Sequence, residues 1–143
     1  MKTLLLLSIF SLCSFAKLSF INPHIAHVIP GSKISAAFLI IKNDSDKAVD
    51  LVGVKSDFAK VIELHTHEME EGVMAMRKVE KMTIPAHGEL VLKSKSLHIM
   101  IFKIQEELKL DSKRKMELSF SDGTKENVDF KIIDVYAKGY KHP

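Results

Sequence analysis

Short runs of β-forming residues, each followed by turn residues, constrain the fold of this chain more than any other feature. The run Lys33–Lys42 is apolar almost throughout, as expected for a buried strand, and it ends at the turn cluster Asn43–Asp46. Asp122-Gly123 predicts a hairpin between Arg114–Phe120 and Asn127–Val135. The other predicted strands are Val49–Val54, Val61–His65, Val73–Val79, Glu89–Leu92 and Leu97–Ile104. About eight short strands, with turns every eight to twelve residues, predict an all-β sandwich or barrel.

The size and charge of the chain limit its function classes. Its 143 residues suffice for one domain with a real core, and 46% of them are hydrophobic. The formal net charge is +3, and the basic residues form no stripe interleaved with aromatic residues. A nucleic-acid partner is therefore not expected. Gln105–Leu110, the one short helical candidate, is expected to be a loop.

The N-terminus is predicted to be a secretory signal peptide, residues 1–16. Lys2 precedes an apolar stretch from Leu4 to Phe15, and cleavage is expected after Ala16. The stretch is shorter than the ~20 residues of a membrane-spanning helix, although uncleaved anchoring is an alternative. Lipid attachment at Cys13 is disfavoured because Leu12 is bulky. Residues 17–143 would then form a single domain without cysteine, located in the periplasm or another extracytoplasmic compartment.

Four possible metal ligands occur at a distinctive spacing in the second half of the chain. His65 is followed after ten residues by Met76, after twenty-one more by His98, and after one more by Met100. Thioether sulfur is soft and favours Cu(I), whereas imidazole binds several metals. A single Met among apolar residues is ordinarily core filler, and a single His at a strand end is ordinarily structural. Together the four residues indicate a copper site, preferentially for Cu(I).

This spacing resembles that of the periplasmic copper chaperones of the PCu(A)C family, whose motif is His-x10-Met-x21-His-x-Met. The matching stretch is Glu63–Met100, and the similarity extends over roughly Lys33 to Val135. Further landmarks are Ser35–Phe38, Met76–Val79, Ile84–Ala86 and Leu97–Met100. The chain departs from the family at His87, where Gly is more usual, and in Leu18–Pro30, which carries His24 and His27 and has no recognisable counterpart.

The resemblance implies a cupredoxin-like Greek-key β-sandwich and a copper carrier rather than an enzyme. Its ligands would be His65, Met76, His98 and Met100. Its partner would be a copper-acceptor protein, such as the dinuclear copper centre of cytochrome c oxidase or another copper chaperone. After signal cleavage the protein is expected to be a monomer without stable membrane insertion.

Several neighbouring residues leave the extent of the site open. His67 could replace His65 or hold Cu(II), and Met69 and Met74 could form a soft entry patch, although solvent-facing roles are favoured for all three. Met82 is expected in the core. His24, His27, His87 and His142 are expected to be surface residues, with a weaker second site at His24 and His27 as an alternative.

Three other function classes compete with the copper carrier. A blue-copper electron carrier needs a Cys thiolate, which the processed chain would lack. A metalloenzyme built on His65, His67 and Glu68 lacks the helical His-Glu-x-x-His arrangement of zinc proteases. The remaining alternative is a secreted β-sandwich that binds a protein partner without metal.

Overall fold

The computed structural model describes residues 17–141, and these residues form ten β-strands without a helix. The strands are β1 (Leu18–Ala26), β2 (Ile34–Asn43), β3 (Val49–Lys55), β4 (Ala59–Glu70), β5 (Val73–Val79), β6 (Met82–Ile84), β7 (Gly88–Leu92), β8 (His98–Ile104), β9 (Lys113–Phe120) and β10 (Lys125–Ile133). The predicted all-β class is confirmed. The signal-peptide and Cys13 predictions lie outside the described residues, and within those residues no helix is long and apolar enough to cross a membrane.

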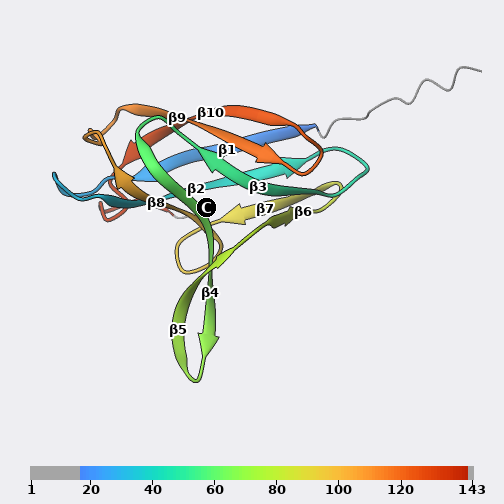
Figure 1. The fold of residues 1–143 in the computed structure, drawn as a ribbon, viewed down its shortest axis with the longest axis horizontal. Helices are drawn as coiled ribbons and strands as arrows, with labels where there is room; N and C mark the ends of the chain where they lie inside the picture. Colours follow the sequence, from blue (N-terminus) through green and yellow to red (C-terminus); the bar gives the residue numbers. More distant parts are fainter. Residues whose placement is uncertain (1–16, 142–143) are drawn as a thin grey trace, which may run out of the picture.

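The strands follow the order β5-β4-β8-β2-β1-β10-β9-β3-β6, with β7 paired to the second half of β2. Many neighbours are distant in sequence, such as β4 with β8 and the parallel pair β1 with β10. The sheet curls so that β3 contacts β4 and β6 contacts β7, which encloses the core in a cupredoxin-like sandwich. In Figure 1 the β4–β5 hairpin projects away from this body.

Side chains from both layers fill the core. On β8, Ile99 and Ile101 are fully buried in the core. His98 and Met100 alternate with them along the strand and therefore project from the other face of the sheet. This confirms the predicted alternation on β8. Other fully buried side chains are Ile25, Leu39, Ile41, Leu51, Ile84, Leu92, Ile104, Met116, Leu118, Phe130 and Ile132.

Two strands were not predicted, and one is longer than predicted. In β1, Asn22 has a positive φ of 49° before Pro23, and the pairing with β2 shifts register there, so a bulge interrupts the strand pattern. β6 has only three residues. β4 continues past His65 to Glu70 because it pairs with β5 along this whole extension. The predicted loop at Gln105–Leu110 and the β9–β10 hairpin are confirmed.

Candidate metal site

Three adjacent strands, in the order β5, β4, β8, bring the predicted ligands onto one face of the sheet. His65 on β4 lies directly opposite His98 on β8. His67, the next residue on the same face of β4, lies opposite Met76 on β5. Met100 stands two residues after His98 and therefore shares its face. The predicted β4–β5 hairpin is present, but the direct partner of Met76 is His67 rather than His65.

Three imidazole rings gather where these strands meet. The His98 ring centroid lies 5.9 Å from that of His65 and 5.0 Å from that of His67. The carbonyl oxygen of Ser96 accepts hydrogen bonds from Nδ1 of His98, at 2.8 Å, and from Nδ1 of His67, at 3.3 Å. Because Nδ1 carries the proton in these bonds, Nε2 of each ring keeps its lone pair for a metal.

A pocket of about 510 Å³ opens beside these rings. Of the predicted ligands, Met76, His98 and Met100 line it, and His67 lines it where His65 does not. Half of the Met76 surface is exposed, at 52%, whereas only 3% of His98 is exposed. The pocket therefore combines a buried imidazole with a thioether that solvent can reach. Its other walls include Ala26, His27, Val28, Ile34, Ala36, Phe38, Val135 and Tyr136.

His65 is held from its other side by a carboxylate. Its Nε2–H donates to Glu63 at 2.9 Å, and the Lys78 ammonium donates to the second oxygen of the same carboxylate, also at 2.9 Å. The His65 ring also lies against Phe102, with centroids 5.9 Å apart. Its Nδ1 is buried and has no hydrogen-bond partner among the described residues. A buried nitrogen of this kind fits a metal ligand, since metal-bound imidazoles commonly donate their other N–H to a carboxylate.

The electrostatics of the cluster favour the neutral form of His98. Burial is the main cause that lowers the pKa of His98, and the neighbouring His67 and His65 lower it further, against the opposing hydrogen bond to Ser96. The pKa of Glu63 is also lowered, chiefly by its hydrogen bond from His65 and then by that from Lys78. A neutral imidazole is the form that binds a metal.

The donor set is mixed nitrogen and sulfur. Within residues 17–141, no three His, Cys, Asp or Glu side chains are grouped so as to hold a metal ion by themselves. Imidazole nitrogen with two thioethers and no thiolate suits a soft, monovalent ion such as Cu(I) better than zinc or calcium.

Met82 and His24 both lie away from the candidate metal site. Met82 is in the core, as predicted. His24 is buried rather than on the surface: its Nδ1–H donates to the Asn22 carbonyl at 2.7 Å, and its Nε2 is hydrogen-bonded to the Tyr140 hydroxyl. This bonding corrects the surface prediction for His24, because the C-terminal segment covers it.

The remaining histidines are separate from this pair. His27 lines the pocket beside Met76 and His98, while His87 is exposed and lies 2.6 Å from the Asp46 carboxylate. His142 lies outside the described residues. Glu63 and Ser96 lie outside the four-residue motif and were not predicted to take part in the site. The signal for Glu63 was its position two residues before His65, on the same face of a predicted strand.

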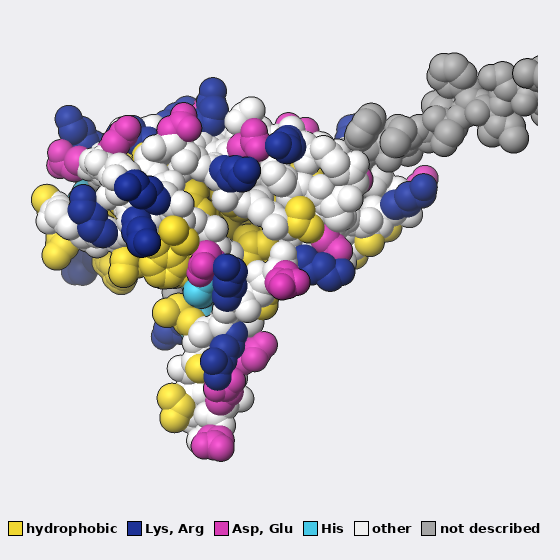
Figure 2. All heavy atoms as spheres, viewed as in Figure 1, with side chains coloured by type: hydrophobic (Ala, Val, Ile, Leu, Met, Phe, Trp, Pro, Cys, Tyr) yellow, Lys and Arg dark blue, Asp and Glu magenta, His cyan; other side chains and the backbone are white. Residues whose placement is uncertain are grey.

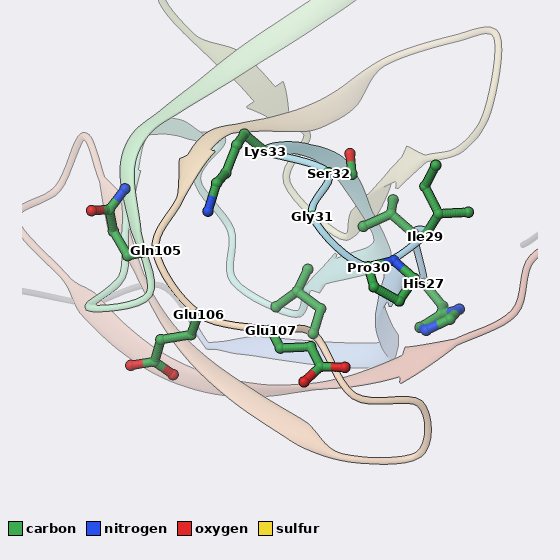
Figure 3. Close-up of a pocket in the computed structure, with 11 residues that line it drawn as sticks. His27, Ile29, Pro30, Gly31, Ser32, Lys33, Gln105, Glu106 and Glu107 are labelled. Atoms are coloured by element: carbon green, nitrogen blue, oxygen red, sulfur yellow. The ribbon is translucent and has the colours of Figure 1, made fainter.

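A second pocket, of about 330 Å³, lies between the β1–β2 connection and the segment after β8 (Figure 3). Lys33, Gln105, Glu106 and Glu107 border it, and His27 is its only imidazole. It contains no thioether among its lining residues, so it does not repeat the chemistry of the first pocket.

Comparison with known proteins places the chain in a family. The profile of the family described as "Putative lipoprotein LpqE-like" matches residues 18–132, most of the chain. The chain belongs to the LpqE-like family. A relative from Leifsonia xyli subsp. xyli, named "Putative lipoprotein Lxx21020", is 30% identical over 105 residues. That match covers 73% of this chain and 63% of the relative.

Solved structures of PCu(A)C domains match this LpqE-like chain. The copper-bound PCuAC domain from PmoF2 superposes with a TM-score of 0.71 at 15% identity, over 82% of this chain and 93% of that domain. The solution structure of CuI-DR1885 from Deinococcus radiodurans gives a TM-score of 0.67 at 29% identity, over 80% of this chain and 77% of that protein. The first match shows the shared fold. Together with the family profile, these matches confirm the resemblance to PCu(A)C proteins.

Proposed function

We propose that this protein is an extracytoplasmic, Cu(I)-binding metallochaperone that passes copper to a copper enzyme, such as the dinuclear copper centre of cytochrome c oxidase. The observation that carries the proposal is the convergence of Met76, His98 and Met100 on one solvent-accessible pocket, with two further imidazoles beside it. The PCu(A)C domains named as copper-bound support the choice of metal. The family's description as lipoproteins supports an extracytoplasmic location.

The proposed ligands are His65, Met76, His98 and Met100. Nδ1 of His65 has no hydrogen-bond partner among the described residues and is available to bind a metal. The Glu63 carboxylate holds the proton of this ring on Nε2, so Nδ1 keeps its lone pair. Neutral thioethers bind Cu(I) without the charge attraction of thiolate, which favours exchange over permanent retention. Among the described residues that line the pocket, no serine hydroxyl is hydrogen-bonded to an imidazole as a nucleophile is to its base, which favours carrying copper over catalysis.

The experiment that tests this function is a Cu(I) titration of the chain from Lys17 onward against a calibrated Cu(I) chelator. X-ray absorption at the copper edge should then be measured on the loaded protein. We expect one tightly held Cu(I) with mixed nitrogen and sulfur scattering. Failure to compete with the chelator, or a shell of nitrogen and oxygen only, would reject the chaperone and favour a metal-free interaction domain.

A paired substitution decides which imidazole of β4 binds. His65→Ala is expected to weaken Cu(I) binding strongly, whereas His67→Ala should act mainly on Cu(II) or on the rate of transfer. If His67→Ala abolishes Cu(I) binding and His65→Ala does not, the first imidazole of the site is His67, which lines the pocket.

A further inference from the structure

The β4–β5 hairpin carries a row of soft ligands on one face beyond the pocket. Met69 lies directly opposite Met74, and His67 lies directly opposite Met76. Residues two apart on a strand share a face, so these two cross-strand pairs follow one another along the same side of the hairpin. The second pair, His67 and Met76, also lines the pocket with His98 and Met100. The row therefore leads from the hairpin tip into the candidate site.

The sulfur atoms near the tip do not serve packing. Met69 is 67% exposed and Met74 is 49% exposed, whereas buried Met82 shows how this chain uses Met in its core. The opposite face of the hairpin carries no sulfur atom: it holds Thr66, Glu68 and the ion pair between Arg77 and Glu70, together with the apolar side chains of Val73 and Ala75. Figure 2 shows the projecting hairpin with hydrophobic side chains towards one side and acidic groups towards the other.

We propose that Met69 and Met74 form an outer Cu(I) position, which receives the ion and passes it through the His67–Met76 pair to the inner pocket. This inference rests on the proposed function of the inner site. Side chains directly opposite on an antiparallel pair have Cβ atoms about 4.5–5.5 Å apart, within reach of one ion for two flexible thioethers. Two thioethers without imidazole hold Cu(I) less tightly than the inner set.

Movement along the row needs no change of charge or oxidation state. Consecutive same-face positions on a strand are about 6.7 Å apart, so each step can proceed by exchange of one ligand at a time. Every donor is neutral: thioether sulfur has no proton to lose, and the copper remains Cu(I) throughout. Exposed Glu71, in the turn at the tip of the hairpin, adds a local negative charge that favours a cation over an anion.

The turn at the tip fixes the pairing of these side chains. Glu71 and Gly72 have φ angles of 47° and 82°, as in the two-residue turns that match the twist of a hairpin. The register is therefore set before any ion arrives, and Met69 faces Met74 in the metal-free protein.

The test is the Cu(I) stoichiometry of the protein and of the double variant Met69→Leu/Met74→Leu. Leu keeps the volume and the apolar surface but removes the sulfur. We expect the unaltered protein to bind a second, weaker Cu(I) after the inner site fills, and the double variant to lose only this second ion. Ag(I), a soft monovalent analogue, should shift the methyl NMR signals of Met69 and Met74 in the unaltered protein.

Val73→Ala is the matched control, because Val73 is equally exposed at 67% but carries no sulfur and lies on the opposite face. It should retain the second ion. Retention of that ion in the double Leu variant, or its absence from the unaltered protein, would overturn the outer position while leaving the inner site intact. Absence of any Cu(I) binding would instead reject the proposed function.

Discussion

At the scale of single residues, the alternation on β8 separates the side chains that pack in the core from the proposed metal ligands. Ile99 and Ile101 fill the core, while His98 and Met100 face the pocket. Met100→Ala should therefore weaken Cu(I) binding at least roughly tenfold, because even the loss of a residue that only hydrogen-bonds a metal ligand has an effect of this size. It should weaken Cu(II) binding less, because the residue removed is a soft ligand. Chelator competition with each oxidation state measures the difference, and equal losses would contradict the assignment.

Met82 provides a buried thioether outside the site, at 3% exposure. Met82→Leu conserves volume, so we expect the free energy of unfolding to change by less than about 1.5 kcal/mol and Cu(I) affinity to stay the same. Urea denaturation and the same chelator competition test both values. A large loss of affinity would mean that Met82, and not one of the pocket residues, supplies a sulfur ligand.

The departure from the family at His87 has a backbone consequence. His87 adopts φ 51°, a conformation that favours Gly, and its pair with Asp46 is exposed and contributes little. We expect His87→Gly to raise the free energy of unfolding by up to about 1 kcal/mol. Gly88→Ala should lower it, because the new Cβ would lie 3.0 Å from Pro85 Cβ. Urea denaturation of both variants should therefore show His87→Gly to be more stable, and Gly88→Ala less stable, than the unaltered protein.

The sequence predicted the candidate ligands but not which imidazole faces the pocket. Spacing and the family resemblance singled out His65, and strand alternation brings it opposite His98. The same alternation puts His67 on the same face, and nothing in the residue pattern decides which of the two rings turns towards Glu63. That choice depends on side-chain contacts across three strands, which local sequence does not encode.

At the scale of elements, the β4–β5 hairpin depends on its turn. Gly72 has φ 82°, and a Cβ added to it would meet no other atom within 4 Å, so Gly72→Ala would cost backbone strain alone, about 1–2 kcal/mol. Because the hairpin projects from the body, we expect this cost to appear as local opening, with amide exchange in β5 roughly tenfold faster and β8 unaffected. Uniformly faster exchange would show that the hairpin unfolds together with the core.

The bounds of several strands could not be predicted from the sequence pattern. β1 was not predictable from the sequence, because a bulge and a positive φ at Asn22, before Pro23, interrupt the alternation of its residues. β4 was predicted to end near His65 because the polar residues that follow are typical of a loop. Pairing with β5 extends it to Glu70. Hairpins such as β9–β10 were predictable because a two-residue turn signal specifies them locally.

At the scale of the whole molecule, the all-β class followed from strand length and turn spacing, but the strand order did not. Pairings such as β4 with β8 and β1 with β10 join segments distant in sequence. Their choice depends on long-range burial of the core, so the family resemblance, rather than periodicity, supplied the Greek-key sandwich.

Burial of His98 links the stability of the metal-free protein to pH. Its pKa lies below the ordinary value of 6.5 because burial disfavours the charged ring, so the unfolded chain binds this proton more readily. The stability that neutral His98 contributes to the folded protein is fully present above the pKa of this residue in the unfolded chain. It is lost as the pH falls through 6.5 towards the lower pKa of His98 in the folded protein. Thermal unfolding of the copper-free protein across this range should show decreasing Tm, and His98→Gln should show a weaker decrease. A Tm that rises on acidification would contradict the assignment.

The contact between Tyr140 and His24 determines where the protein tolerates attachments. Val135 and Tyr136 form part of the pocket wall, and Tyr140 is bonded to β1 shortly after them. A bulky purification tag or fluorescent label attached close to Tyr140 would compete with this contact, only a few residues along the chain from the pocket wall that Val135 and Tyr136 form. A label in the β9–β10 turn, which contributes no residue to the pocket wall, is the better choice for following the proposed copper exchange in real time.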